Sequence, residues 1–208
     1  MRPGLCQEAL RLGRVLASLL PDQSEVHGLV ALMEIQASRA GARVNSDGEP
    51  ILLLEQNRSR WDRLLIRRGL IALKRSEQLG GSEKPYALQA AIAACHARAV
   101  RADDTDWAMI AAHYDTLASV VPSPVIELNR AVALAMAYGP AAGLQLADQL
   151  VDEPALSRYH LLPAVRGDLL FKLDRRDQAR EQFELAASLT DNERERALMQ
   201  QRAAACAS

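Results

Sequence analysis

Polar side chains that could recognise a partner are concentrated between Asp47 and Asp62, in a segment that helical periodicity does not explain. Asp47-Gly48 and Pro50 signal a turn, because glycine tolerates a positive φ and proline lacks a backbone donor. A short apolar run then leads into a polar cluster of Gln56, Asn57, Arg58 and Asp62. Such a cluster can form either a network that fixes an irregular segment or a surface that binds a partner. Both interpretations stay open from the sequence.

The basic side chains form one concentrated tract that begins in the same segment. Its members are Arg58, Arg60, Arg63, Arg67, Arg68, Lys74 and Arg75. On a helix, Arg60, Arg63, Arg67 and Lys74 fall near one face. Arginine binds carboxylates through two parallel hydrogen bonds, so this face could dock acidic elements of a protein. The alternative is a solvated face that is partly paired with Asp62.

The residue types that usually carry catalysis are not arranged for it. The four histidines, His27, His96, His113 and His160, lie on different expected helices, and no catalytic or phosphate-binding motif occurs. An acidic cluster at residues 103–106 precedes an expected helix, whose N-terminal dipole favours negative charge. The three cysteines lack metal-ligand spacing and fit reduced thiols on apolar helix faces. We therefore expect no enzyme, no metal and no cofactor.

The two tryptophans, Trp61 and Trp107, are expected to anchor packing, because an indole ring buries a large area while its nitrogen finds a partner. Trp61 lies inside the polar cluster and is therefore also a candidate interaction residue.

Composition favours an all-α chain. Of the 208 residues, 49% are hydrophobic and only 4% aromatic, so the core must consist mostly of alanine and aliphatic side chains, which suit close helix packing. The net charge of −1 provides no general basic excess, which argues against DNA binding by the chain alone. The N-terminal apolar run is short and interrupted by arginines, so we expect no signal peptide and no membrane span. A cytoplasmic protein is expected.

Apolar spacing predicts a succession of helices. The first, at about residues 5–20, carries Leu5, Ala9, Leu12, Leu16 and Leu19 on one stripe. Others are expected at about 25–40, 60–79, 85–99, 106–119, 124–137, 140–150, 159–173, 176–189 and 192–205, with an irregular segment at 41–57. We divide the chain into an N-terminal helical subdomain, residues 1–81, and helical repeats with a capping helix, residues 82–208.

A repeat becomes visible when the later helices are superposed in sequence. The residues Gly167, Leu170, Ala179, Phe183 and Ala186 reproduce the spacing of the tetratricopeptide pattern. A copy upstream has small or apolar residues at all five places: Ala131, Leu134, Gly143, Ala147 and Leu150. A degenerate third pair is expected at residues 85–119. Paired helices stacked in this way form a solenoid with an open concave face.

Three polar residues of the repeats are candidates for that concave face. Asn129, Arg130 and Arg166 lie on first helices of repeat pairs, where they could hold a peptide backbone or a carboxylate. Only some positions of a first helix face the groove, so Arg130 could point elsewhere. A structural role for Asn129 fits the pattern at least as well.

Four stretches carry a resemblance to a known family. They are LCQEALRLGRVLASLLP, EVHGLVALMEIQASRAGARV, DGEPILLLEQNRSRWD and PSPVIELNRAVALA. Together they resemble the long C-terminal extension, containing tetratricopeptide repeats, of one group of bacterial extracytoplasmic-function RNA polymerase sigma factors. The sequence departs from that family at Asn45 and Asn57, where the family has aspartate.

The resemblance implies a non-catalytic regulatory and protein-interaction domain that contributes to the control of transcription initiation. Its partners would be the sigma promoter-binding modules of the full-length protein, and RNA polymerase or a regulatory protein. The promoter-reading modules of that family have no counterpart in these residues, so we expect a part of a longer protein that does not bind DNA directly. Two alternatives remain: a free-standing tetratricopeptide adaptor, and a ligand sensor or enzyme that uses the irregular segment as a pocket wall.

Overall fold

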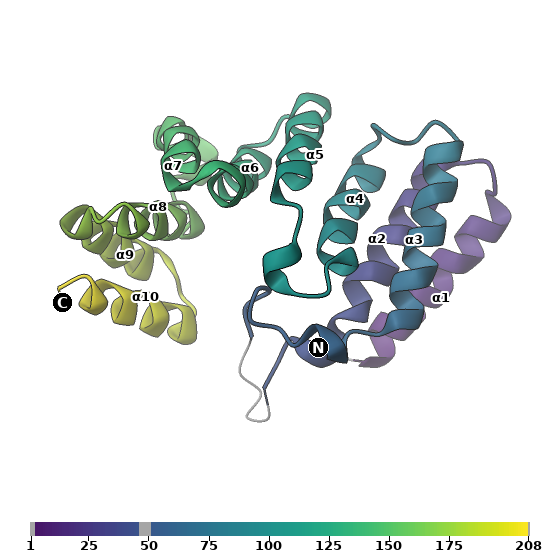
Figure 1. The fold of residues 1–208 in the computed structure, drawn as a ribbon, viewed down its shortest axis with the longest axis horizontal. Helices are drawn as coiled ribbons and strands as arrows, with labels where there is room; N and C mark the ends of the chain where they lie inside the picture. Colours follow the sequence, from purple (N-terminus) through teal and green to yellow (C-terminus); the bar gives the residue numbers. More distant parts are fainter. Residues whose placement is uncertain (1–2, 46–50, 208) are drawn as a thin grey trace. The chain divides into compact units, whose positions relative to one another are not determined.

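The computed structural model describes residues 3–45 and 51–207, and within them it contains ten α-helices, four short 3-10 helices and no strand (Figure 1). The prediction of an all-α chain is confirmed. The helices form two compact units, residues 1–121 and residues 122–208. No helix in the described ranges combines the length and the apolar character that a bilayer crossing requires.

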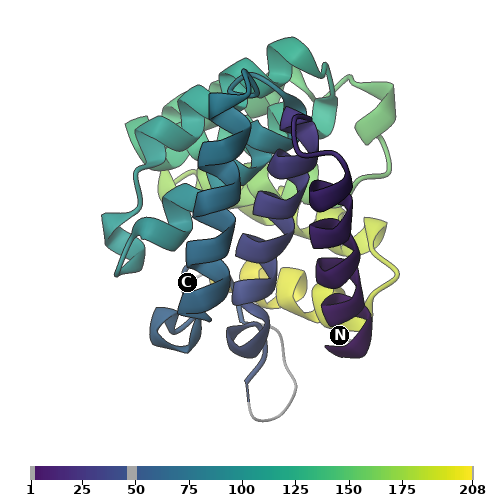
Figure 2. The ribbon, with the colours of Figure 1, turned by 90° about the vertical axis from the view of Figure 1, so that its right-hand side faces the viewer.

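The first unit is built around helix α2. Its α-helices are α1 (Pro3–Leu19), α2 (Ser24–Ser38), α3 (Arg63–Gln78), α4 (Pro85–Arg98) and α5 (Trp107–Val120). Helix α2 contacts α1, α3 and α4, and Figure 2 shows it lying between α1 and α3. Alanines give α4 a small cross-section, and Ala90 and Ala94 are fully buried. Three 3-10 turns connect these helices: η1 (Ala40–Ala42), η2 (Arg58–Arg60) and η3 (Ala102–Asp104).

The apolar stripe predicted on the first helix does not face the rest of the unit. Leu5, Leu12 and Leu19 are exposed, whereas Leu10 and Gly13 are buried. A Cβ atom placed on Gly13 would already touch Met33 and Val30 of α2, at 3.4 and 3.5 Å. Because Gly13 has no side chain, α1 approaches α2 closely along this line, and the leucine stripe is left on the outside.

The second unit consists of consecutive helix pairs followed by a single helix. Its helices are α6 (Pro124–Tyr138), α7 (Pro140–Gln149), α8 (Leu161–Lys172), α9 (Arg176–Leu189) and α10 (Glu193–Ala205), with the 3-10 turn η4 (Pro154–Leu156). Helix α6 packs against α7, α8 against α9, and α10 against α9. Gly139 is the single residue between α6 and α7. Its φ is 98°, a conformation that glycine adopts without strain.

Small residues lie where the paired helices of this unit meet. A Cβ atom on Gly143 would stand 2.5 Å from the carbonyl oxygen of Ala131, and one on Gly167 would stand 2.8 Å from the ring of Phe183. Ala131 itself is fully buried. The expectation that Ala131 and Gly167 occupy close helix contacts is therefore confirmed.

The boundary between the compact units differs from the predicted boundary between residues 81 and 82. The units divide between Val121 and Pro122, because α4 packs on α2 and α5 packs on α4. At Gly28 of α2, an added Cβ would lie only 2.8 Å from the backbone nitrogen of Ala87 in α4. The region expected to hold a degenerate third repeat pair thus belongs to the first unit.

Candidate functional site

The polar segment before α3 is held in place by its own side chains and by α2. Asp62 caps α3, because its carboxylate accepts hydrogen bonds from the backbone nitrogens of Leu64 and Leu65, at 2.8 and 3.1 Å. The backbone nitrogen of Asp62 donates to the carbonyl oxygen of Ser38 at the end of α2. The Asn57 side chain accepts from both the backbone nitrogen and the hydroxyl of Ser59. Asp62 and Asn57 therefore shape the local backbone.

Arg58 is the anchor of the segment and is only 5% exposed. Its Nη1 atom donates to the carbonyl oxygens of His96 and Ala99, at 2.6 and 2.9 Å, and its Nη2 donates to the hydroxyl of Thr105 at 2.9 Å. The last carbonyls of a helix lack partners within the helix, and Arg58 supplies donors to two carbonyls at the end of α4. This burial removes Arg58 from any docking surface and favours the structural interpretation of the network.

Trp61 packs beside this anchor and is almost fully buried. The guanidinium carbons of Arg58 and Arg39 lie 5.2 and 5.7 Å from its ring centre, within the range of cation–π attraction. Burial, together with the positive charges of Arg43 and Arg58, lowers the pKa of Arg39 to about 10. Trp61 is thus an internal packing residue, as expected for an anchor. Its buried indole nitrogen, however, has no hydrogen-bond partner among the described protein atoms, so that part of the expectation is wrong.

Gln56 is buried in the same segment, and its amide nitrogen donates to the carbonyl oxygen of Ile51 at 3.1 Å. Asp47 lies outside the described residues, and Arg63 lies on the exposed surface at the start of α3. Trp107 is half-buried, and its ring stands edge-on to His96 with centroids 5.2 Å apart.

His96 is a buried histidine that stays neutral over an unusually wide pH range. Burial, and then the positive charges of Arg58 and Arg39, lower its pKa from 6.5 to about 4. Its Nδ1 atom has no hydrogen-bond partner among the described protein atoms, so a proton there would gain no acceptor. At neutral pH His96 is therefore an uncharged imidazole that carries a single ring N–H.

The depressed pKa of His96 predicts a loss of stability in mild acid. Between pH 6.5 and 4 the unfolded chain binds a proton at His96 that the folded chain excludes. The free energy of unfolding therefore decreases as the pH is lowered through this window, and the full contribution of His96 is present above pH 6.5. We expect the His96 contribution at pH 5 to be lower than at pH 7 by about 2 kcal/mol. Urea unfolding at both pH values measures the change. The His96→Gln variant should have a smaller pH dependence, and an unchanged dependence would contradict the assignment.

A cleft of about 710 Å³ opens beside the anchored segment. It lies among α1, the end of α2, the η1 turn and the start of α3, and its walls are mostly apolar. Arg60 and Asp62 are the two predicted interaction residues that line it, together with Arg43. The cleft has the composition of a surface for an apolar group with a polar edge.

The basic tract is divided by the fold. Arg58 is internal and Arg60 lines the cleft just described, whereas Arg68 and Arg75 line a second cleft of about 450 Å³. Glu34 of α2 lines this second cleft and is 1% exposed, with its carboxylate 2.6 Å from Nε of Arg14. Sequence reasoning missed this pair. The one available signal in the sequence was the position of Glu34, which follows the buried Val30 of α2 by four residues and therefore lies on the same face of the helix.

In the second unit, α6, α8 and α10 together line a shallow cleft of about 230 Å³. Its floor is apolar, from side chains that include Val132, Met136 and Leu169. Asp168 lies at its edge and pairs with Lys172 at 2.7 Å and with Arg202 at 3.0 Å.

The three residues predicted for the concave face do not line this cleft. Arg166 points to the second helices of the pairs, because it binds Asp148 of α7 at 2.9 Å and Gln182 of α9 at 2.7 Å. Arg130 pairs with Glu127 one turn away at 2.9 Å, and Asn129 is exposed. That these three residues face a concave groove stays a prediction.

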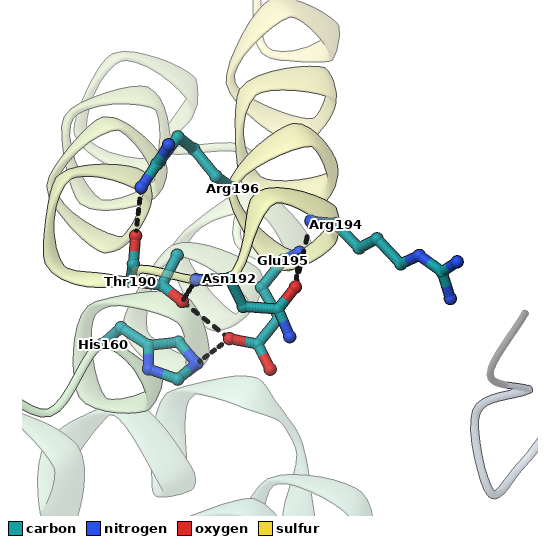
Figure 3. A network of polar contacts seen from close by, with 6 residues as sticks. All are labelled: His160, Thr190, Asn192, Arg194, Glu195 and Arg196. Atoms are coloured by element: carbon teal, nitrogen blue, oxygen red, sulfur yellow. Dashed lines mark hydrogen bonds and ion pairs between the residues drawn. The ribbon is translucent and has the colours of Figure 1, made fainter.

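A polar network fixes the start of the last helix (Figure 3). Asn192 caps α10 by accepting from the backbone nitrogens of Arg194 and Glu195. Glu195 in turn accepts from the Thr190 hydroxyl at 2.7 Å and lies 3.3 Å from Nε2 of His160. The network ties the loop after α9 to the residue that precedes α8, so the last helix is firmly attached to the unit.

Comparisons with known proteins give relatives without a described activity. Residues 1–77 match a family of unknown function, DUF6596, and this part contains α1, α2 and the anchored segment. The chain is 42% identical over 193 residues to an uncharacterized protein of Rhizobium meliloti (strain 1021). The match covers 93% of this chain and 45% of that protein, so the chain spans about half the length of this relative. No solved structure matches the chain.

Proposed function

We propose that the chain is a non-catalytic regulatory and protein-interaction domain of an extracytoplasmic-function RNA polymerase sigma factor, with tetratricopeptide-like repeats in its second unit. The observation that carries the proposal is the order of the helices in the second unit: the pair α6–α7, then the pair α8–α9, then α10 packed on α9. Ala131, Gly143 and Gly167 lie at the contacts within the pairs. These are the residues from which the repeat was predicted, and they support the repeat register. The sequence resemblance supplies the link to sigma factors.

The cleft lined by α6, α8 and α10 supports a protein ligand. Its floor is apolar and its edge carries the charges of Asp168, Lys172 and Arg202, a combination that suits one side of a helix or an extended peptide. In a sigma factor, the occupant would be a segment of the promoter-binding modules or of RNA polymerase. The greater length of the Rhizobium relative leaves room for such modules in one polypeptide.

Direct binding measurements test this proposal. The chain, immobilised on a biosensor, is expected to bind purified bacterial RNA polymerase, or sigma modules supplied as a separate polypeptide. Met136→Glu places a charge on the cleft floor and should weaken this binding at least tenfold. The matched control Leu185→Glu changes an exposed leucine of α9 and should bind normally. Absence of binding to both partners, with the chain folded, would remove the sigma-factor assignment and leave the adaptor alternative.

The chain is also expected not to bind promoter DNA by itself. Its net charge is −1, and phosphate neutralisation by basic side chains supplies most of the affinity of DNA-binding proteins. A gel-shift assay at physiological salt, with promoter and unrelated duplexes, measures this. Tight, sequence-dependent binding to the promoter would contradict an accessory role.

A further inference from the structure

The outer face of α1 is an apolar surface that the first unit leaves open. Leu5, Leu12 and Leu19 are 66%, 53% and 71% exposed, and Leu16 and Leu20 are exposed as well. A different line of the helix, through Leu10 and Gly13 and roughly a third of a turn away, is the one buried against α2. Helix α1 is therefore apolar on two sides, and one of these sides is in contact with α2.

The spacing on the outer face is that of a coiled-coil seam. Leu5, Ala9, Leu12, Leu16 and Leu19 follow each other at intervals of four, three, four and three residues, which places them at successive a and d positions. The polar residues next to the seam are already balanced, because Arg11 pairs with Glu8 at 2.7 Å. A seam of this kind packs well against another helix whose apolar residues also alternate at intervals of three and four.

We propose that this face binds a second copy of the chain through antiparallel packing of the two α1 helices. With Leu12 on the two-fold axis, Leu5 lies opposite Leu19 of the other copy and Ala9 lies near the other Leu16. Leucines then meet leucines at the axis and at both ends of the seam, and Leu16 has the small Ala9 beside it. The same residues serve both copies, as a two-fold interface requires. The antiparallel direction also keeps the two Glu8 carboxylates apart.

The size and charge of the surface agree with a weak, reversible dimer. Complete burial of the exposed side chains of this face would remove roughly 1,000 Å² in total from solvent, which is below the lower limit of about 1,200 Å² for stable interfaces and in the range of weak ones. The net charge of −1 opposes the approach of two copies only slightly. We therefore expect dissociation in the micromolar range.

Light scattering coupled to size-exclusion chromatography, from low micromolar to submillimolar concentration, tests the dimer. The wild-type chain is expected to change from its own mass to twice that mass. Leu12→Glu brings two carboxylates together on the axis and should keep the chain monomeric at all these concentrations. Leu12→Lys should do the same, and a mixture of the two variants should form a heterodimer, because the opposite charges then face each other.

Leu185→Glu, which makes the same change at an exposed leucine of α9, is the control and should dimerise like the wild type. Circular dichroism confirms that each variant keeps its helices, which is expected because Leu12 is half exposed. A wild-type chain that stays monomeric overturns the proposal, and so does a dimer that Leu12→Glu leaves intact. Failure of the Glu and Lys variants to associate overturns the proposed register.

Discussion

Arg58→Ala is expected to lower the free energy of unfolding by about 3–5 kcal/mol. The substitution removes three hydrogen bonds from a charged group and leaves the carbonyl oxygens of His96 and Ala99 without their donor. It also removes the guanidinium that lies over the ring of Trp61. Urea unfolding, followed by far-UV circular dichroism, measures the loss.

Arg63→Ala is the matched control, because Arg63 is an exposed arginine five residues further along the chain. Exposed charges contribute about 0–1 kcal/mol, so this variant should unfold almost like the wild type. Arg58→Lys should recover little of the loss, since an ammonium group cannot reproduce the planar fork that reaches three acceptors. If Arg58→Ala and Arg63→Ala had equally small effects, Arg58 would not be the anchor that the structure indicates.

The helices could be predicted from the sequence because their signals are local. Proline at the first turn marks α4, α6 and α7, and Asn192 caps α10, so these boundaries follow from nearby residues. The helix after the polar segment starts three residues later than expected. Asp62 caps it, and Arg58 to Arg60 form a separate 3-10 turn.

The roles of the candidate residues depend on contacts that are distant in sequence and could not be predicted. Arg58 belongs to a tract of otherwise exposed basic residues, and its burial depends on acceptors about 40 residues away. Arg166 was placed on the correct helix, but its direction is fixed by Asp148 and Gln182 on neighbouring helices. On α1, two apolar stripes compete, and the glycine at position 13 selects the one that packs against α2.

Gly143→Leu is expected to destabilise the second unit by about 4 kcal/mol, more than Gly167→Leu, for which we expect about 1–3 kcal/mol. Both substitutions force a side chain into a contact between paired helices. At Gly143 the nearest atoms are the backbone oxygen of Ala131 and the Cβ of Ala135, both at 2.5 Å, and neither can move without shifting α6. At Gly167 the nearest atoms belong to the ring of Phe183, which can give way by a change of side-chain position.

The order of these two effects distinguishes a clash with backbone from a clash with a side chain. Calorimetric and urea unfolding of both variants measure it, and Gly4→Ala serves as the control, because a Cβ atom there meets nothing within 4 Å. That control should leave stability unchanged or raise it slightly, since alanine favours a helix by up to about 1 kcal/mol over glycine. A Gly143 variant as stable as the wild type would mean that α6 and α7 do not approach each other as closely as the repeat register requires.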